Sequence, residues 1–100
     1  MKDCVDTEII AEIWSIIEKR AKNPSQESYT SRLLTDKKGI DKVLEKVGEE
    51  SIEFIIAAKN GLKDRTVEEA SDLIFHLLVA LYASDIDLSD VMHELERRRK

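Results

Sequence analysis

Residues 46–81 decide the fold, and they read KVGEESIEFIIAAKNGLKDRTVEEASDLIFHLLVAL. The stretch predicts two long helices joined by a tight turn, because Asn60-Gly61 is a helix-ending pair and neither side contains a proline. The first helix is expected to begin at residue 37 or 40 and to end at residue 59. The second is expected to begin near Thr66, which precedes Glu69 in the S/T-x-x-E spacing of a capping box. Helices joined by so short a turn are antiparallel neighbours.

The second helix contains LIFHLLVALYA at residues 73–83, a run that is apolar on every side. A helix of this kind lies at the centre of a bundle or in the core of a dimer. A spacing of about 100° per residue puts four apolar residues on the packed face of the first helix: Val43, Val47, Phe54 and Ala58.

Amphipathic helices are also expected over residues 7–22 and 88–99, with a short helix near residues 31–34. No strand pattern, repeat or long linker separates these segments. The sequence therefore predicts a single all-α domain over residues 1–100, a four-to-five-helix bundle built on a central antiparallel hairpin. Because so small a bundle would hardly cover the apolar run at residues 73–83, a dimeric core is also expected.

Composition excludes several classes of protein. The chain has 100 residues and a formal net charge of -5, so it lacks the basic excess of a general nucleic-acid binder. The longest uncharged stretch, residues 73–84, is shorter than the roughly 20 residues that cross a membrane. A single cysteine and an N-terminus without a signal-peptide core favour a reduced, cytoplasmic protein.

Five acids need an explanation: Glu49, Glu50, Glu53, Glu69 and Asp72. Spacings of three and four residues put like charges side by side on each helix, which destabilises a helix by a few tenths of a kcal/mol per pair. The two sets stand at about equal distances from the turn, so an antiparallel hairpin brings them face to face. Converging carboxylates suit a hard divalent cation such as Mg²⁺, which completes its shell with water and phosphates. The alternative is a solvated acidic face.

Three neighbouring residues have two interpretations each. His76 is one turn after Asp72, and is either a core histidine bonded to Asp72 or a catalytic group. Lys46 either pairs with Glu50 or contacts a phosphate. Lys42 belongs to a basic run that could hold a polyanionic substrate, although solvated lysines are the commoner explanation.

The segments KVGEESIEFIIAAKN (residues 46–60) and EEASDLIFHLLVAL (residues 68–81) resemble the phosphoribosyl-ATP pyrophosphatase family. The family belongs to the MazG-like all-α NTP pyrophosphohydrolases, whose signature is E-E-x-x-E followed by E-x-x-D. The segment SYTSRLL (residues 28–34) also resembles the family's stretch before the long helix. The resemblance covers about residues 10–97.

This resemblance implies Mg²⁺-dependent hydrolysis of 1-(5-phosphoribosyl)-ATP to 1-(5-phosphoribosyl)-AMP and pyrophosphate, the second step of histidine biosynthesis. It implies that four residues hold the metal: Glu50, Glu53, Glu69 and Asp72. Glu49 would join Glu50 and Glu53 in catalysis, as a ligand of a second ion or as the base that orients water. Candidate substrate contacts are Lys46 and the segment Ser28, Tyr29 and Thr30. The family is typically homodimeric.

Two alternatives remain at this point. One is a house-cleaning nucleotide pyrophosphatase with the same metal site, and the other is a non-catalytic helical dimerisation module. Some relatives carry a fused cyclohydrolase with a zinc site. The sequence has neither the length nor the Cys and His ligands for that domain, so a monofunctional enzyme is expected.

Overall fold

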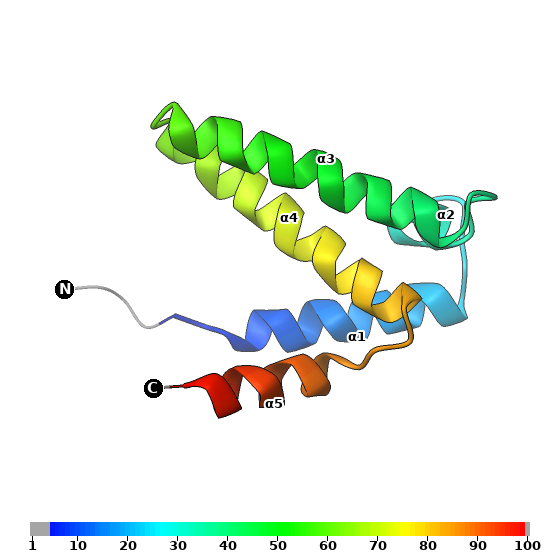
Figure 1. Cartoon of the computed structure of the whole chain (residues 1–100). Coiled ribbons are helices and arrows are strands. Elements are labelled where there is room, and N and C mark those ends of the chain that lie inside the picture. The colour runs from blue at the N-terminus through cyan, green and yellow to red at the C-terminus, as the bar shows by residue number, and fades with distance from the viewer. Residues whose placement is uncertain (1–4, 100) are drawn as a thin grey trace.

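A computed structural model describes residues 5–99, so Cys4 lies outside the described part of the chain. Helices make up this part, without strands, as the sequence predicted. In chain order they are α1 (Glu8–Lys22), α2 (Tyr29–Leu34), α3 (Ile40–Lys59), α4 (Lys63–Ala83) and α5 (Leu88–Arg98) (Figure 1). None of the described helices is long and apolar enough to cross a membrane.

Helices α3 and α4 form the predicted antiparallel hairpin, and α4 then runs down to the layer that α1 and α5 form side by side (Figure 1). The turn between α3 and α4 is a Schellman motif. Gly61 adopts a positive φ of 68°, its amide bonds to the carbonyl of Ala58, and the Leu62 amide bonds to the carbonyl of Ala57. The sequence therefore identified the end of α3 correctly.

The predicted start of α4 was wrong. The helix begins at Lys63 with Leu62 as its N-cap, and the Thr66 hydroxyl donates to the Leu62 carbonyl at 2.7 Å instead of capping. The Schellman turn leads directly into the next helix, so Thr66 already lies within its first turn. Glu69 is consequently free for another role.

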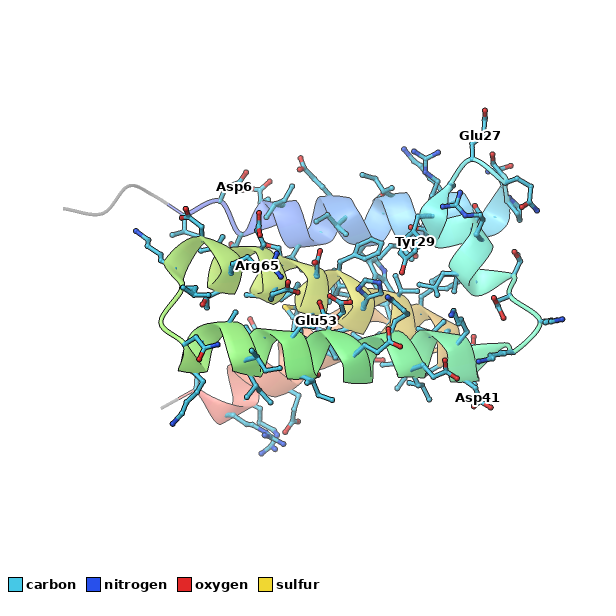
Figure 2. All side chains as sticks on the ribbon, turned by 90° about the horizontal axis from the view of Figure 1, so that it is seen from above. Asp6, Glu27, Tyr29, Asp41, Glu53 and Arg65 are labelled. Atoms are coloured by element: carbon cyan, nitrogen blue, oxygen red, sulfur yellow. The ribbon has the colours of Figure 1, made fainter. Side chains whose placement is uncertain are left out.

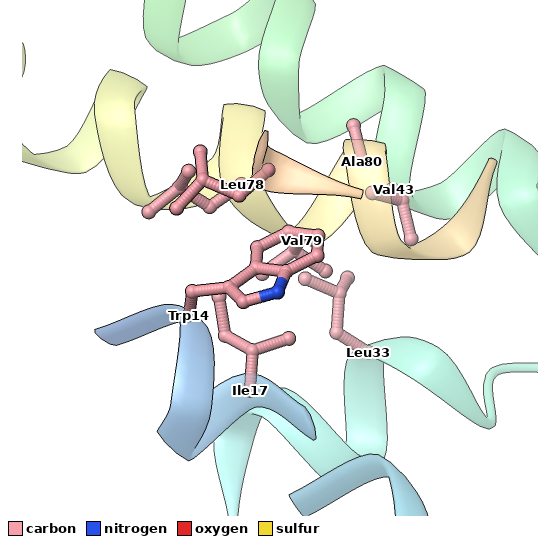
Figure 3. Packing of buried hydrophobic residues seen from close by; sticks show 8 residues of the cluster. Trp14, Ile17, Leu33, Val43, Leu78, Val79 and Ala80 are labelled. Carbon is pink, nitrogen blue, oxygen red and sulfur yellow. The ribbon is translucent and has the colours of Figure 1, made fainter. Parts of the chain in front are cut away.

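The core lies where α1 and α2 pack against the lower half of α4. Ile17 and Val79 are fully buried, with Trp14 and Leu33 beside them (Figure 3). The hydroxyl of Ser31 donates to the carbonyl of Arg20 at 2.9 Å and so ties α2 to the end of α1. α2 consequently lies beside the half of the hairpin that is farther from its turn (Figure 1).

The packed face of α3 differs from the prediction at one position. Val43 and Ala57 are buried, but Ala58 is exposed. Residues 43, 50 and 57 recur every seven positions and therefore line the seam with α4, whereas residue 58 lies about 100° further round the helix. Glu50 thus occupies a seam position and is buried.

One side of the hairpin carries exposed apolar residues, which we call the outer face. Its five members are between 45% and 60% exposed: Leu44 and Ile55 on α3, and Val67, Ile74 and Leu77 on α4. The run at residues 73–83 is therefore only partly covered within one chain. Rotation about each helix axis, viewed from the N-terminus of that helix, places these residues roughly 80–160° from the seam in one direction. Glu53 and Asp72 are rotated from the seam in the other direction. The acids and the outer face are on opposite sides of the hairpin.

Candidate active site

Three carboxylates from two helices converge in the middle of the hairpin. Glu50 of α3 and Glu69 and Asp72 of α4 each offer an oxygen atom, and these atoms all lie within 4.8 Å of one another. Glu50 and Asp72 stand at equal distances along the chain on either side of Gly61. The tight turn and antiparallel packing therefore create the cluster. Glu50 and Glu69 are buried, and Asp72 is exposed and opens the cluster to solvent.

Glu69 has an oxygen atom that the protein leaves without a partner. Its Oε2 accepts from the Arg65 guanidinium, but its Oε1 is buried and has no hydrogen-bond partner within residues 5–99. Burial raises the pKa of Glu69, Arg65 opposes that rise, and the charges of Glu53, Asp72 and Glu50 add to it. A hard cation bound here would give the buried oxygen atom a partner and would offset the repulsion among the neighbouring carboxylates. The donor set therefore fits a divalent metal ion.

The other two predicted acids lie at the edge of this cluster. Glu53 is exposed, and it lies on the same side of the hairpin as Arg65 and Tyr29 (Figure 2). Its charge reaches the cluster, since it contributes to the raised pKa of Glu69. The side chain of Glu49 is 57% exposed and pairs with Lys46 at 3.2 Å. The structure thus brings three of the five acids together and leaves two at the rim.

Lys46 connects the rim to the buried acids. Its Nζ lies 3.2 Å from Glu49 and 3.7 Å from Glu50, so the predicted pair with Glu50 is present. The hydrogen bond to Glu49 is the main cause that raises the pKa of Lys46. Lys46 therefore carries a positive charge next to the cluster at neutral pH.

Tyr29 reaches the site from α2 and is held there by His76. The phenol oxygen is 2.7 Å from His76 Nε2, and His76 Nδ1 is 2.7 Å from the main-chain carbonyl of Asp72. A carbonyl only accepts, so Nδ1 carries the proton and Nε2 accepts from the Tyr29 hydroxyl. The predicted bond from His76 to Asp72 thus exists, but to the main chain and not to the carboxylate. Burial is the main cause that raises the pKa of Tyr29, and Lys46 opposes it.

The remaining predicted contacts have different surroundings. The Ser28 hydroxyl accepts from the Ser31 amide and caps α2, and Thr30 is buried. Lys42 lines a small pocket together with Tyr29 and Lys46. Of the segment at residues 28–30, Tyr29 is therefore the side chain placed beside the carboxylates.

Sequence reasoning missed two arginines. Arg65 pairs with Glu69, and the spacing of four residues could have indicated that pair. Arg32 lines the same small pocket as Lys42, and its position three residues after Tyr29 could have placed both on one face of a short helix. A larger hollow of about 820 Å³ lies between α1 and α5, away from the converging acids.

The structure places E-E-x-x-E on α3 and E-x-x-D on α4, the arrangement expected of the helical pyrophosphohydrolases that the sequence resembles. The sequence model of the family described as phosphoribosyl-ATP pyrophosphohydrolase matches residues 10–99. The chain belongs to this family. The resemblance seen in the sequence is therefore confirmed.

Similar proteins from other organisms agree with this assignment. The chain is 66% identical over 99 residues to the phosphoribosyl-ATP pyrophosphatase of Methanoregula boonei, covering 99% of this chain and 95% of that protein. It is 60% identical over 95 residues to the same enzyme of Methanoculleus marisnigri, covering 95% and 98%. It is also 50% identical over 93 residues to the histidine biosynthesis bifunctional protein HisIE of Caldanaerobacter subterraneus, covering 93% of this chain and 44% of that protein.

Proposed function

We propose that the chain hydrolyses 1-(5-phosphoribosyl)-ATP to 1-(5-phosphoribosyl)-AMP and pyrophosphate in histidine biosynthesis. The observation that carries the proposal is the convergence of Glu50, Glu69 and Asp72 in a member of this family, with one oxygen of Glu69 unpartnered. A cluster of this kind is unfavourable unless it binds a cation, and cations held by few carboxylates bind phosphates. The site therefore suits a phosphoanhydride substrate.

The metal in this proposal is Mg²⁺, which Glu50, Glu69 and Asp72 would hold together with Glu53. When bound, Mg²⁺ neutralises phosphate charge and polarises the phosphorus that water attacks. Mg²⁺ prefers ligand sets made of oxygen atoms alone, whereas softer transition metals prefer nitrogen or sulfur ligands.

The side chains around the metal site are proposed to activate water, to contact the substrate and to position one another. Glu49, which is exposed at the rim, is proposed to orient a water molecule and accept its proton. The water oxygen bonds to the α-phosphorus, the bond to the bridging oxygen breaks, and pyrophosphate leaves with that oxygen. Lys46 is a donor beside the cluster and is proposed to contact the substrate phosphates. Tyr29 is proposed to join it, with its hydroxyl exchanging the bond to His76 Nε2 for one to a phosphate oxygen. His76 is a positioning residue, because it acts by orienting Tyr29.

The assignment of substrate is tested by hydrolysis assays. Phosphoribosyl-ATP and a panel of dNTPs are supplied separately with Mg²⁺, and released pyrophosphate is measured. We expect kcat/KM for phosphoribosyl-ATP to exceed that for every dNTP. Hydrolysis of dNTPs without hydrolysis of phosphoribosyl-ATP would instead favour the house-cleaning alternative. The absence of any hydrolysis would favour a dimerisation module.

The hydrogen bond between Tyr29 and His76 leads to a second prediction. Tyr29→Phe removes the hydroxyl and should raise KM by about tenfold, as expected for one lost hydrogen bond to a charged group. His76→Phe should have a similar effect, since it releases Tyr29 from its position. In the double variant the effects should not add, because His76 acts through Tyr29.

The control for this cycle is Tyr82→Phe, which alters a tyrosine that packs against Trp14 in the core. It should leave KM unchanged. Additive effects of Tyr29→Phe and His76→Phe on KM would contradict a positioning role for His76. Circular dichroism and Tm measurements separate that outcome from loss of the fold.

We further propose that the protein is a homodimer that buries the outer face. That face is apolar on both helices of the hairpin and has little charge, which suits pairing with a second copy of the same surface. It also lies opposite the acids, so pairing there leaves the carboxylate cluster accessible.

A further inference from the structure

A small pocket next to the carboxylate cluster is rich in cations. It has a volume of about 360 Å³, and three of its lining residues carry positive charge: Arg32, Lys42 and Lys46. One carboxylate, Asp36, also lines it, and that group accepts from the Lys38 amide at 2.9 Å. The pocket therefore has a net positive charge in a protein whose formal net charge is -5.

Two of these cations have no acidic partner. Within residues 5–99, neither Arg32 nor Lys42 forms an ion pair. Arg32 donates from Nη1 to the carbonyl of Gln26 at 2.7 Å, which fixes the guanidinium while leaving its other N–H groups available. Neighbouring cations without counter-ions repel each other, and an anionic ligand would remove that repulsion.

The pocket and the carboxylate cluster share a boundary. Lys46 lines the pocket, and its Nζ is 3.7 Å from the buried Glu50. Tyr29 also lines the pocket, and His76 connects it to the main chain of Asp72. A ligand in the pocket is therefore adjacent to the group that the carboxylates bind through their metal ion.

We propose that this pocket binds the pyrophosphoryl group of the substrate, the part that leaves on hydrolysis, with Arg32 and Lys42 as its principal contacts. The inference rests on the proposed function and adds the location of the leaving group. Charge-assisted bonds from these side chains strengthen as negative charge develops on the departing pyrophosphate. They therefore lower the barrier to reaction as well as binding the ground state.

The substrate has a second anionic end, the phosphate on its additional ribose. That phosphate is separated from the scissile bond by the length of the nucleoside, whereas the β- and γ-phosphates are bonded directly to the reacting centre. A pocket that shares Lys46 with the acid cluster matches the nearer group. Its volume is at the lower end for small-molecule sites, so it holds one phosphate-bearing group and not a whole nucleotide.

The test measures binding of inorganic pyrophosphate and of ribose 5-phosphate by calorimetry, at constant excess free Mg²⁺. Arg32→Gln and Lys42→Gln should each raise the Kd of pyrophosphate by about tenfold or more, the effect of one charge-assisted hydrogen bond. They should leave the Kd of ribose 5-phosphate unchanged. Both variants should also lower kcat/KM for phosphoribosyl-ATP.

The matched control is Lys59→Gln, which removes one positive charge from an exposed residue at the opposite end of α3. It should leave the Kd of pyrophosphate unchanged. Unchanged pyrophosphate binding in both pocket variants would overturn the proposal, and so would weaker binding of ribose 5-phosphate alone. Failure of the wild-type protein to hydrolyse phosphoribosyl-ATP would contradict the proposed function. The pyrophosphate titration would still test whether the pocket binds pyrophosphate.

Discussion

Glu69→Gln is expected to reduce the hydrolysis of phosphoribosyl-ATP by at least about 100-fold while raising the Tm of the metal-free protein. The loss of activity follows from the loss of a metal ligand, since residues that merely orient such ligands contribute roughly 10- to 100-fold. The gain in stability follows from burial, which raises the pKa of Glu69 and so disfavours its ionised form in the folded state. Glutamine has the shape of the residue without the charge.

The same argument fixes the direction of the pH dependence. The pKa of Glu69 is higher in the folded protein than in the unfolded chain, so the folded protein retains a proton that the unfolded chain has lost. The metal-free wild type therefore loses stability as pH rises through that window, starting near the unfolded value of about 4.3. Glu69→Gln removes this pH-dependent loss of stability. The variant should therefore have a higher Tm than the wild type at neutral pH, and the same Tm well below the pKa of Glu69 in the unfolded chain.

Adding Mg²⁺ separates the two effects. A ligand that binds the native state stabilises it by about 2.7 kcal/mol at 100 times its Kd. The wild type should show such a rise in Tm, and Glu69→Gln should show little. The control is Glu68→Gln, because Glu68 is also paired with Arg65 but is exposed. A wild-type Tm that did not respond to Mg²⁺ would contradict the metal site.

The second large effect concerns the outer face. Ile55→Glu places a charge in the proposed interface and should raise the Kd of the dimer by about 100-fold or more, since an unpaired buried charge costs about 3–5 kcal/mol. Sedimentation velocity should show a dimer for the wild type and a monomer for the variant. Ile74→Glu, on the other helix of the hairpin, should have the same effect.

Ile86→Glu is the control for this experiment, because Ile86 is also exposed but lies between α4 and α5. This variant should remain dimeric. The proposal would be contradicted by a monomeric wild type, or by dimers that survive both hairpin substitutions. Far-ultraviolet circular dichroism confirms that the monomeric variants retain their helices.

The parts of the fold that depend on local chemistry were predictable. Asn60-Gly61 marked the turn because a positive φ is required there, and α3 ends as expected. The start of α4 was missed because Thr66 and Glu69 satisfy the capping pattern in sequence, while the geometry of the preceding turn decides where the helix begins. Capping signals describe single helices, and here the hairpin overrides them.

The site was partly predictable for the same reason. Spacing alone brought Glu50, Glu69 and Asp72 together, because helical periodicity and an antiparallel turn fix their height and direction. Their burial was not predictable, since it depends on which residues form the seam. The bond between Tyr29 and His76 joins residues 47 positions apart, and its existence depends on how α2 packs.

The position of the turn also limits how the length of the chain can change during evolution. One residue inserted between Glu69 and Val79 would turn the acid about 100° away from its partners relative to the core. An insertion at Asn60-Gly61 would leave the spacing of the acids within α3 and within α4 unchanged, and a longer loop could still join the two helices in the same register. Differences in length among related sequences should therefore accumulate in this turn and at the chain ends, with constant spacing inside each acidic helix.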